Sequence, residues 1–378
     1  MDGGATAGLT ADPRHPSTVA DWDDARRRHR LHETRHGLVW KILLCLLPVL
    51  VAANQYWLED VVPERDRLAH TRPDVQTIYQ PQRRADADIA VVDLVGLGNL
   101  DARQTARTLS GFADIGQVWA VKYDNRGIDT KVIADLIVER AALFDVDHIV
   151  LVGHSMGGVV ALEVAEHIYH DTDRNLVGVI LDCTPLGIGA VRPQSRDRGE
   201  NLLRFLGWLP GARESRTIRA AVEIGSRHHI YLDGLDVDWR SLRGVTEWVL
   251  RQKILAVDAA STGLVESQFK TIVASGAVDN LDALAQQRRD KPRPGIVLLR
   301  PRDGSRDGIV DVDQTEQILH EQLDGLPGTL VVAELDGTEH ANPNSHPAEY
   351  NSAISRRLVP FLRLHLEEPV ADLASGRR

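Results

Sequence analysis

Residues 149–160 have the sequence IVLVGHSMGGVV, which predicts a buried strand, a sharp turn and then a helix. Glycine lies two positions on either side of Ser155, which gives the pattern G-x-S-x-G. A serine hydroxyl is a weak nucleophile unless a turn holds it clear of the strand and beside a base. Such a turn leaves no room for flanking side chains. Gly153 and Gly157 supply this room, and Gly158 lets the helix close onto the sheet.

The predicted helix begins at Met156, so its N-terminus directs backbone N–H groups toward an oxyanion beside the serine. This stretch resembles the nucleophile motif of the α/β-hydrolase superfamily, in its Gly-His-Ser-Met-Gly-Gly form. The resemblance implies an α/β fold with a mostly parallel sheet, flanking helices and a large helical cap insertion.

The rest of the chain supports alternating strands and helices. Helical spacing of apolar residues predicts a crossover helix over 128–144, between the second and third of the core strands. Strand, helix, strand order implies parallel strands with helices on both faces. Apolar runs predict these core strands: Ile89–Val95, Gln117–Tyr123, Ile149–Val152, Leu176–Leu181, Ile296–Leu299 and Gly328–Leu335.

Gly96-Leu97-Gly98-Asn99 follows the first core strand. In the superfamily a His-Gly loop at this place supplies the second oxyanion-hole N–H, and here Val95 stands where the histidine usually is. The resemblance makes Leu97 the donor through its backbone, with Gly96 as the near alternative. An ordinary strand-to-helix turn is the competing interpretation.

The resemblance also implies a catalytic acid after the strand Ile296–Leu299. Asp307 fits the superfamily's Asp-x-x-Val context, Asp303 is the alternative, and Asp311 is expected to cap the following helix.

The catalytic histidine is expected after the last strand, several residues before a proline-led helix. His340 has this spacing, whereas His346 immediately precedes Pro347 and is expected at the helix cap. The chain order Ser155, Asp307, His340 is the one expected for this fold.

The N-terminal third has a different composition. Arginines precede the run from Leu38 to Ala53, which is apolar except for Lys41 and is interrupted by Pro48, and Trp and Tyr lie near both ends. This pattern predicts a membrane segment over residues 38–57, with the catalytic domain extracytoplasmic by the positive-inside bias. Sixteen residues are short for a span. A cleaved signal peptide and a soluble apolar helix, with a cytoplasmic protein, are the alternatives.

The predicted organisation follows from these features. We expect a disordered, basic region over 1–36, a membrane anchor over 37–58, a linker over 59–86 that leads into an edge strand near Val75–Tyr79, and a polar tail over 367–378. The hydrolase-like core is expected over 87–185 and 294–366, and the helical cap over 186–293, where strand signals stop.

The net charge of −10 argues against nonspecific nucleic-acid binding. The two cysteines form no C-x-x-C pair, so a metal or disulfide framework is not expected. The serine chemistry that the resemblance implies requires no cofactor. The resemblance therefore predicts a serine hydrolase that cleaves carboxylic esters, esterase- or lipase-like. An acyltransferase and an inactive membrane-tethered binding protein are the alternatives.

Overall fold

The computed structural model describes residues 17–256, 259–288 and 290–367, and the chain divides into two compact units after Glu59. The expectations for residues 1–16 and for the tail over 368–378 lie outside the described residues. The two units are described in turn.

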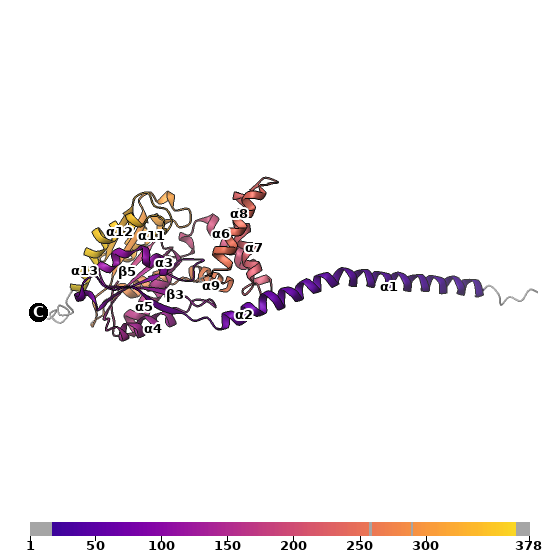
Figure 1. Cartoon of the computed structure of the whole chain (residues 1–378), viewed down its shortest axis with the longest axis horizontal. Coiled ribbons are helices and arrows are strands. Elements are labelled where there is room, and N and C mark those ends of the chain that lie inside the picture. Colours follow the sequence, from indigo (N-terminus) through magenta and orange to yellow (C-terminus); the bar gives the residue numbers. More distant parts are fainter. Residues whose placement is uncertain (1–16, 257–258, 289, 368–378) are drawn as a thin grey trace, which may run out of the picture. The chain divides into compact units, whose positions relative to one another are not determined.

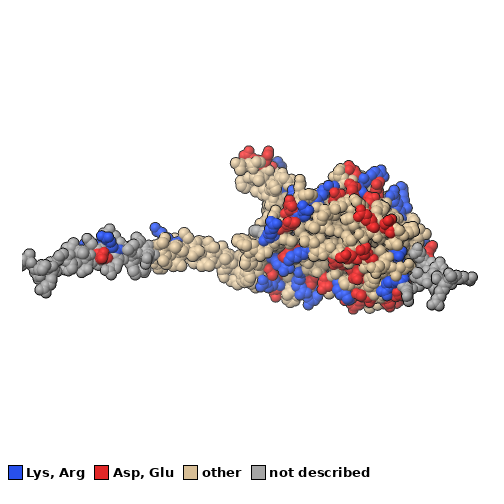
Figure 2. Space-filling model, turned by 180° about the vertical axis from the view of Figure 1, so that it is seen from behind, with Lys and Arg blue, Asp and Glu red and all other residues tan. Residues whose placement is uncertain are grey.

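The first unit is helix α1, Ser17–Gln55. Residues 17–36, which were expected to be disordered, are helical, because their Arg, Leu, Glu and Ala residues favour helix and the run continues directly into the apolar segment. Pro48 lies inside the helix without ending it. The apolar side chains from Leu38 to Val51 are exposed (Figure 2).

Within the described residues, Leu38–Ala69 is the one helical stretch long and apolar enough to cross a membrane. A membrane anchor and a signal sequence share this length and composition.

The second unit contains a seven-stranded sheet in the order β1-β3-β2-β4-β5-β8-β9. All neighbouring strands are parallel except β1, which pairs antiparallel with β3 at one edge. The predicted mostly parallel sheet is therefore confirmed. Its strands are β1 (Asp74–Tyr79), β2 (Ile89–Leu94), β3 (Gln117–Lys122), β4 (His148–His154), β5 (Asn175–Asp182), β8 (Gly295–Pro301) and β9 (Leu330–Leu335).

Helices cover both faces of this sheet (Figure 1). Helices α4, α5 and α10 pack together on one face, and α12 and α13 lie on the other. The helices are α2 (Val62–Ala69), α3 (Arg103–Thr108), α4 (Thr130–Leu143), α5 (Met156–Asp171), α6 (Pro193–Trp208), α7 (Arg216–Ser226), α8 (Trp239–Val249), α9 (Thr262–Val273), α10 (Ala277–Ala285), α11 (Val312–Gln322), α12 (Pro347–Ala353) and α13 (Val359–Glu367).

The segment expected to be a linker contains ordered structure. Helix α2 lies in it, as does the predicted edge strand β1, whose pairing with β3 extends the sheet. Glu64 and Leu68 of α2 are buried, and Glu64 forms ion pairs with Arg67 and Arg216. The prolines of this segment lie at the ends of α2 and β1, so they do not indicate a flexible connection.

Within the described residues of the stretch expected to be a cap, helices α6 to α10 are the main elements. A small hairpin between α7 and α8, β6 (Leu232–Asp233) with β7 (Asp236–Val237), was not predicted from the sequence. Helices α6, α7 and α8 make up the first part of this insertion between β5 and β8 (Figure 1). Helices α9 and α10 instead contact α5, and their apolar residues, including Leu264 and Leu281, belong to the main core. The last part of the insertion is therefore built into the hydrolase-like core.

Helix α5 approaches the sheet closely through its glycines, and this contact generates a prediction. A Cβ on Gly157 would overlap the carbonyl oxygens of Leu94 and Val95. We expect Gly157→Ala to lower the free energy of unfolding by about 2 kcal/mol or more, although alanine favours helix, because overpacking against backbone outweighs propensity.

The matched control is Gly207→Ala, in helix α6, where no atom lies within 4 Å of an added Cβ. This variant should gain up to about 1 kcal/mol. Urea unfolding measures the free energy of unfolding of both variants. Equal changes in the two variants would contradict the close contact of Gly157 with the carbonyl groups of Leu94 and Val95.

Candidate active site

Ser155 occupies a strained turn between strand β4 and helix α5. Its φ is 54° and its ψ is −122°, a backbone conformation that residues other than glycine rarely adopt. A Cβ on Gly153 would overlap Gly157 and Gly158, and a Cβ on Gly158 would overlap Thr184. The glycines therefore provide the room that the sequence analysis assigned to them.

His340 lies between Ser155 and Asp307. Its Nε2 is 2.8 Å from Ser155 Oγ, and its Nδ1 is 2.8 Å from Asp307 Oδ2. The imidazole is largely buried, and Asp307 is fully buried. The structure thus brings the three residues predicted from three distant segments into one hydrogen-bonded chain.

The carboxylate of Asp307 is hydrogen-bonded to two backbone N–H groups as well as to His340. Its Oδ1 accepts hydrogen bonds from the N–H groups of Ile309 at 2.9 Å and Val310 at 2.8 Å. Burial would raise the pKa of Asp307, but the hydrogen bond and charge of His340 and these N–H groups lower it below its ordinary value. The group is therefore a stable carboxylate facing the imidazole.

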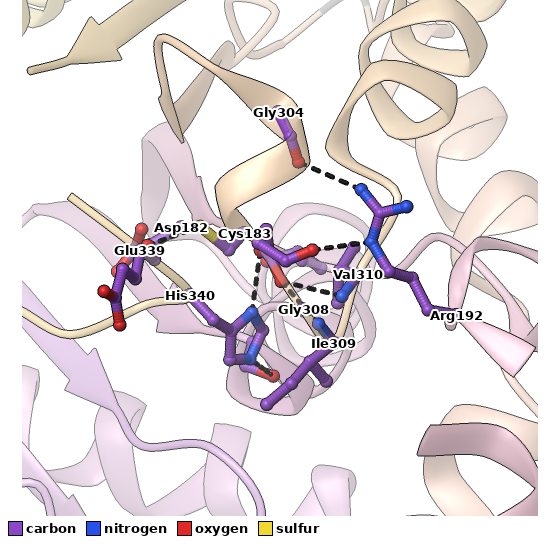
Figure 3. A network of polar contacts seen from close by, with 12 residues as sticks. Asp182, Cys183, Arg192, Gly304, Gly308, Ile309, Val310, Glu339 and His340 are labelled. Atoms are coloured by element: carbon purple, nitrogen blue, oxygen red, sulfur yellow. Dashed lines mark hydrogen bonds and ion pairs between the residues drawn. The ribbon is translucent and has the colours of Figure 1, made fainter. Parts of the chain in front are cut away.

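Arg192 fixes the loop that carries Asp307. Its guanidinium donates to the backbone carbonyls of Asp307 at 2.6 Å and Gly304 at 3.0 Å (Figure 3). Sequence reasoning missed this residue, because it lies 115 positions from Asp307 and no local pattern marks the contact.

The alternative residues lie elsewhere. Asp303 is exposed and accepts hydrogen bonds from the N–H and hydroxyl of Ser305. His346 occupies the N-cap position of α12. Asp311 caps α11 by accepting from Gln314 N–H at 3.2 Å, as predicted.

The loop after β2 lies against the serine turn. A Cβ on Gly96 would be 2.8 Å from the carbonyl oxygen of His154 and 3.2 Å from Ser155 Cβ. Leu97 follows in the same loop, and Met156 is the first residue of α5, where a helix leaves its N–H groups unpaired. The two backbone groups predicted as oxyanion donors thus belong to segments that meet at Ser155.

Gln268 holds this loop from helix α9. Its side chain is fully buried, its Oε1 accepts from Gly98 N–H at 2.8 Å, and its Nε2 donates to the Asn99 carbonyl at 2.8 Å. The sequence analysis did not single out Gln268, because a glutamine within a helix carries no sign of a partner 169 residues away.

A second group of buried polar residues lies beneath the serine turn. His154 Nδ1 is 2.7 Å from Asp182 Oδ2, and its Nε2 is 3.1 Å from Asp93 Oδ1. The Tyr350 hydroxyl donates to Asp182 at 3.0 Å. All four side chains are buried. An aspartate within each of two apolar strands was the signal that could have revealed this cluster, since unpaired buried carboxylates are rare.

The imidazole of His154 is stabilised in its charged form. Burial alone would lower its pKa, but the charge of Asp93 and hydrogen bonds with Asp182 and Asp93 outweigh burial and raise the pKa to about 10. The charged form of His154 is therefore favoured at neutral pH, directly below Ser155.

Cys183 lies beside Asp307 and His340. Among the described residues, these three side chains form the group that could hold a metal ion. One ligand atom from each of the three residues lies within 4.8 Å of the others. Cys183 is buried, and burial together with the nearby Asp182 and Asp307 raises the pKa of its thiol well above the ordinary value. This thiol is therefore a poor nucleophile.

A cavity of about 410 Å³ opens onto Ser155 and His340. Its walls come from the loops after β2, β5, β8 and β9 and from helix α9. In parallel α/β sheets, ligands bind outside the carboxyl ends of the strands, which is where these loops meet.

Comparison with known proteins identifies a family. The family model described as the alpha/beta hydrolase family matches residues 68–353. A search of curated proteins finds no match.

Among solved structures, the chain is similar to a monoacylglycerol lipase from Paleococcus ferrophilus, with 16% identity over 78% of this chain and 99% of that one and a TM-score of 0.47. It is also similar to an esterase from Exiguobacterium antarcticum, with 16% identity, 78% and 96% coverage and a TM-score of 0.48. A proline iminopeptidase from Mycobacterium smegmatis has 12% identity, 82% and 98% coverage and a TM-score of 0.45.

The raised pKa of His154 predicts how stability depends on pH. A folded-state pKa above the ordinary 6.5 gives a stabilising contribution that is fully present below pH 6.5 and is lost as the pH rises through about 10. We expect the free energy of unfolding to fall over this interval, and to fall less steeply in His154→Gln.

The control is His228→Gln, which removes an exposed histidine. Urea unfolding at several pH values measures the slopes. A His154→Gln slope equal to that of the wild type and of the control would show that His154 is not charged in the folded protein.

Proposed function

The chain belongs to the alpha/beta hydrolase family, and from this premise we propose that it is a serine hydrolase that cleaves carboxylic esters through an acyl-enzyme intermediate. The observation that carries the proposal is the chain of two hydrogen bonds, each 2.8 Å long, that runs from Ser155 through His340 to Asp307. This geometry meets the distance requirement for a nucleophile, its general base and the group that orients the base.

In the proposed mechanism, Ser155 Oγ attacks the ester carbonyl while His340 Nε2 takes its proton. Asp307 holds the imidazole with Nδ1 protonated and stabilises the imidazolium that forms. The backbone N–H groups of Met156 and Leu97 stabilise the oxyanion. The intermediate collapses, the C–O bond to the alcohol breaks, and His340 returns the proton to the leaving alcohol.

Water then completes the cycle. His340 removes a proton from a water molecule, the resulting hydroxide attacks the acyl carbon, and the bond to Ser155 Oγ breaks. The proton returns to Ser155 and the carboxylic acid leaves. Ser155 and His340, which carry these steps, both line the cavity, and the proposed mechanism requires no cofactor.

Substitutions at Ser155 and at the two aspartates test the proposed triad and separate the proposed acid from its alternative. We expect Ser155→Ala to abolish turnover of p-nitrophenyl acyl esters and labelling by a fluorophosphonate probe, because the nucleophile is lost. Asp307→Asn should lower kcat by about 10⁴-fold through the wrong imidazole tautomer.

Asp303→Asn is the matched control, since it makes the same change on an exposed residue a few positions away, and it should retain nearly full activity. Thermal unfolding confirms that each variant is folded. Ester turnover by Ser155→Ala, or a larger loss in Asp303→Asn than in Asp307→Asn, would refute the proposed triad.

We further propose that the apolar part of α1 anchors the protein in a membrane with the catalytic domain extracytoplasmic. Exposed Arg26 and Arg27 precede the apolar stretch, and the positive-inside bias keeps such residues in the cytoplasm. In a bacterial host, alkaline phosphatase fused after residue 60 should be active, whereas a fusion after residue 36 should be inactive. An inactive fusion after residue 60 would overturn the orientation.

A further inference from the structure

A second cavity, of about 260 Å³, lies between helices α2 and α7 and the segment that leads into α9. It shares no lining residue with the cavity at Ser155. Its ionisable lining side chains are four cations, Arg67, Arg216, Arg219 and Lys253, and two carboxylates, Glu64 and Glu214. The walls of this cavity therefore carry more positive than negative charge.

The two lining carboxylates are already engaged by arginines. Glu64 forms ion pairs with Arg67 and with Arg216. Glu214 forms an ion pair with Arg65 at 3.4 Å. Neither carboxylate is therefore free to compensate the other two lining cations.

Those two cations depend on one carboxylate outside the lining. Arg219 forms an ion pair with Glu223 at 2.6 Å, but Glu223 also pairs with Arg227. Lys253 forms no hydrogen bond or ion pair within the part of the chain that the structure describes, and its ammonium lies 5.9 Å from the ring of Trp248. Three neighbouring cations thus share a single carboxylate.

Burial makes this excess of positive charge costly. Arg219 is only 6% exposed, and its buried Nε has no hydrogen-bond partner among the described residues. Burial, together with the charges of Arg219 and Arg227, holds the pKa of Lys253 below its ordinary value, and burial also lowers the pKa of Arg219. A buried donor and a buried charge without partners both destabilise a fold, so an anion that enters this cavity would stabilise the protein.

We propose that this cavity is a binding site for a phosphate group, held by the guanidinium of Arg219 and the ammonium of Lys253. A phosphate group combines negative charge with several acceptor oxygens, so one group can accept charge-assisted hydrogen bonds from both side chains. Helix α2 follows the proposed membrane anchor, so two sources of the group are within reach: a phospholipid headgroup and a soluble phosphate compound. The inference does not depend on the proposed ester hydrolysis.

Binding of inorganic phosphate tests the site directly. Isothermal titration calorimetry on the full-length protein in neutral detergent, with chloride keeping the ionic strength constant, should show saturable binding. Lys253→Gln and Arg219→Gln should each weaken it at least about 10-fold, because each removes a charge-assisted donor. The matched control Lys131→Gln changes an exposed lysine of α4 outside the cavity and should bind like the wild type. No binding by the wild type, or equal binding by all three variants, would overturn the proposal.

Thermal unfolding separates a binding role of Lys253 from a structural one. Without phosphate, Lys253→Gln should not lower the Tm, because the substitution removes a charge that no carboxylate compensates. Saturating phosphate should raise the Tm of the wild type and not that of Lys253→Gln. A lower Tm of phosphate-free Lys253→Gln would show that a carboxylate of the chain, such as Asp258 outside the described residues, already holds this lysine, and would overturn the proposal.

Native mass spectrometry distinguishes the two sources of phosphate. The detergent-solubilised protein is mixed with phosphatidylglycerol, and the retained lipid is compared between the wild type, Lys253→Gln and Lys131→Gln. Less retained lipid in Lys253→Gln alone would support the site with a phospholipid headgroup as its ligand. Equal retention in all three proteins, with calorimetric binding of inorganic phosphate lost only in Lys253→Gln, would support the site with a soluble phosphate compound as its ligand.

Discussion

The contact between helix α5 and the sheet at Gly153, Gly157 and Gly158 is the constraint on which the site depends. Without side chains at these positions the helix lies directly on strands β2 and β4, and the turn between strand and helix must take the positive φ of Ser155. Such a conformation costs about 1–3 kcal/mol and persists only where its surroundings hold it. Here the Ser155 N–H donates to the Asp182 carbonyl at 2.7 Å, and Gly96 packs against the other side.

The buried charges under this turn link the strands that carry the site. Asp93 belongs to β2, His154 to β4 and Asp182 to β5, and Tyr350 connects them to α12. The loop that carries Leu97 follows β2 and Ser155 follows β4, so the ion cluster lies directly below both. Breaking one member would leave an uncompensated charge in the core, which is far more costly than losing a surface ion pair.

Much of the fold could be predicted because its signals are local. The strands and the serine turn follow from apolar runs and a short motif, and the resemblance to the α/β-hydrolase superfamily led from the last two core strands to Asp307 and His340. Gln268, Arg192 and the partners of His154 could not be predicted, because each acts across more than 25 positions and its sequence neighbours are ordinary. The helix over 17–36 was missed because charged residues dominate it, although most of them also favour helix.

The position of helix α9 limits how the insertion between β5 and β8 can vary between related proteins. Its apolar face is part of the main core, while Gln268 on the same helix holds Gly98 and Asn99. The insertion between β5 and β8 is therefore not a separable module along its whole length. Apolar residues of α7 and α8 form a small cluster of their own, so these two helices can diverge in evolution with little effect on the core. Leu202 of α6 packs against the core, and a recombination point inside α9 would break the packing and the loop together.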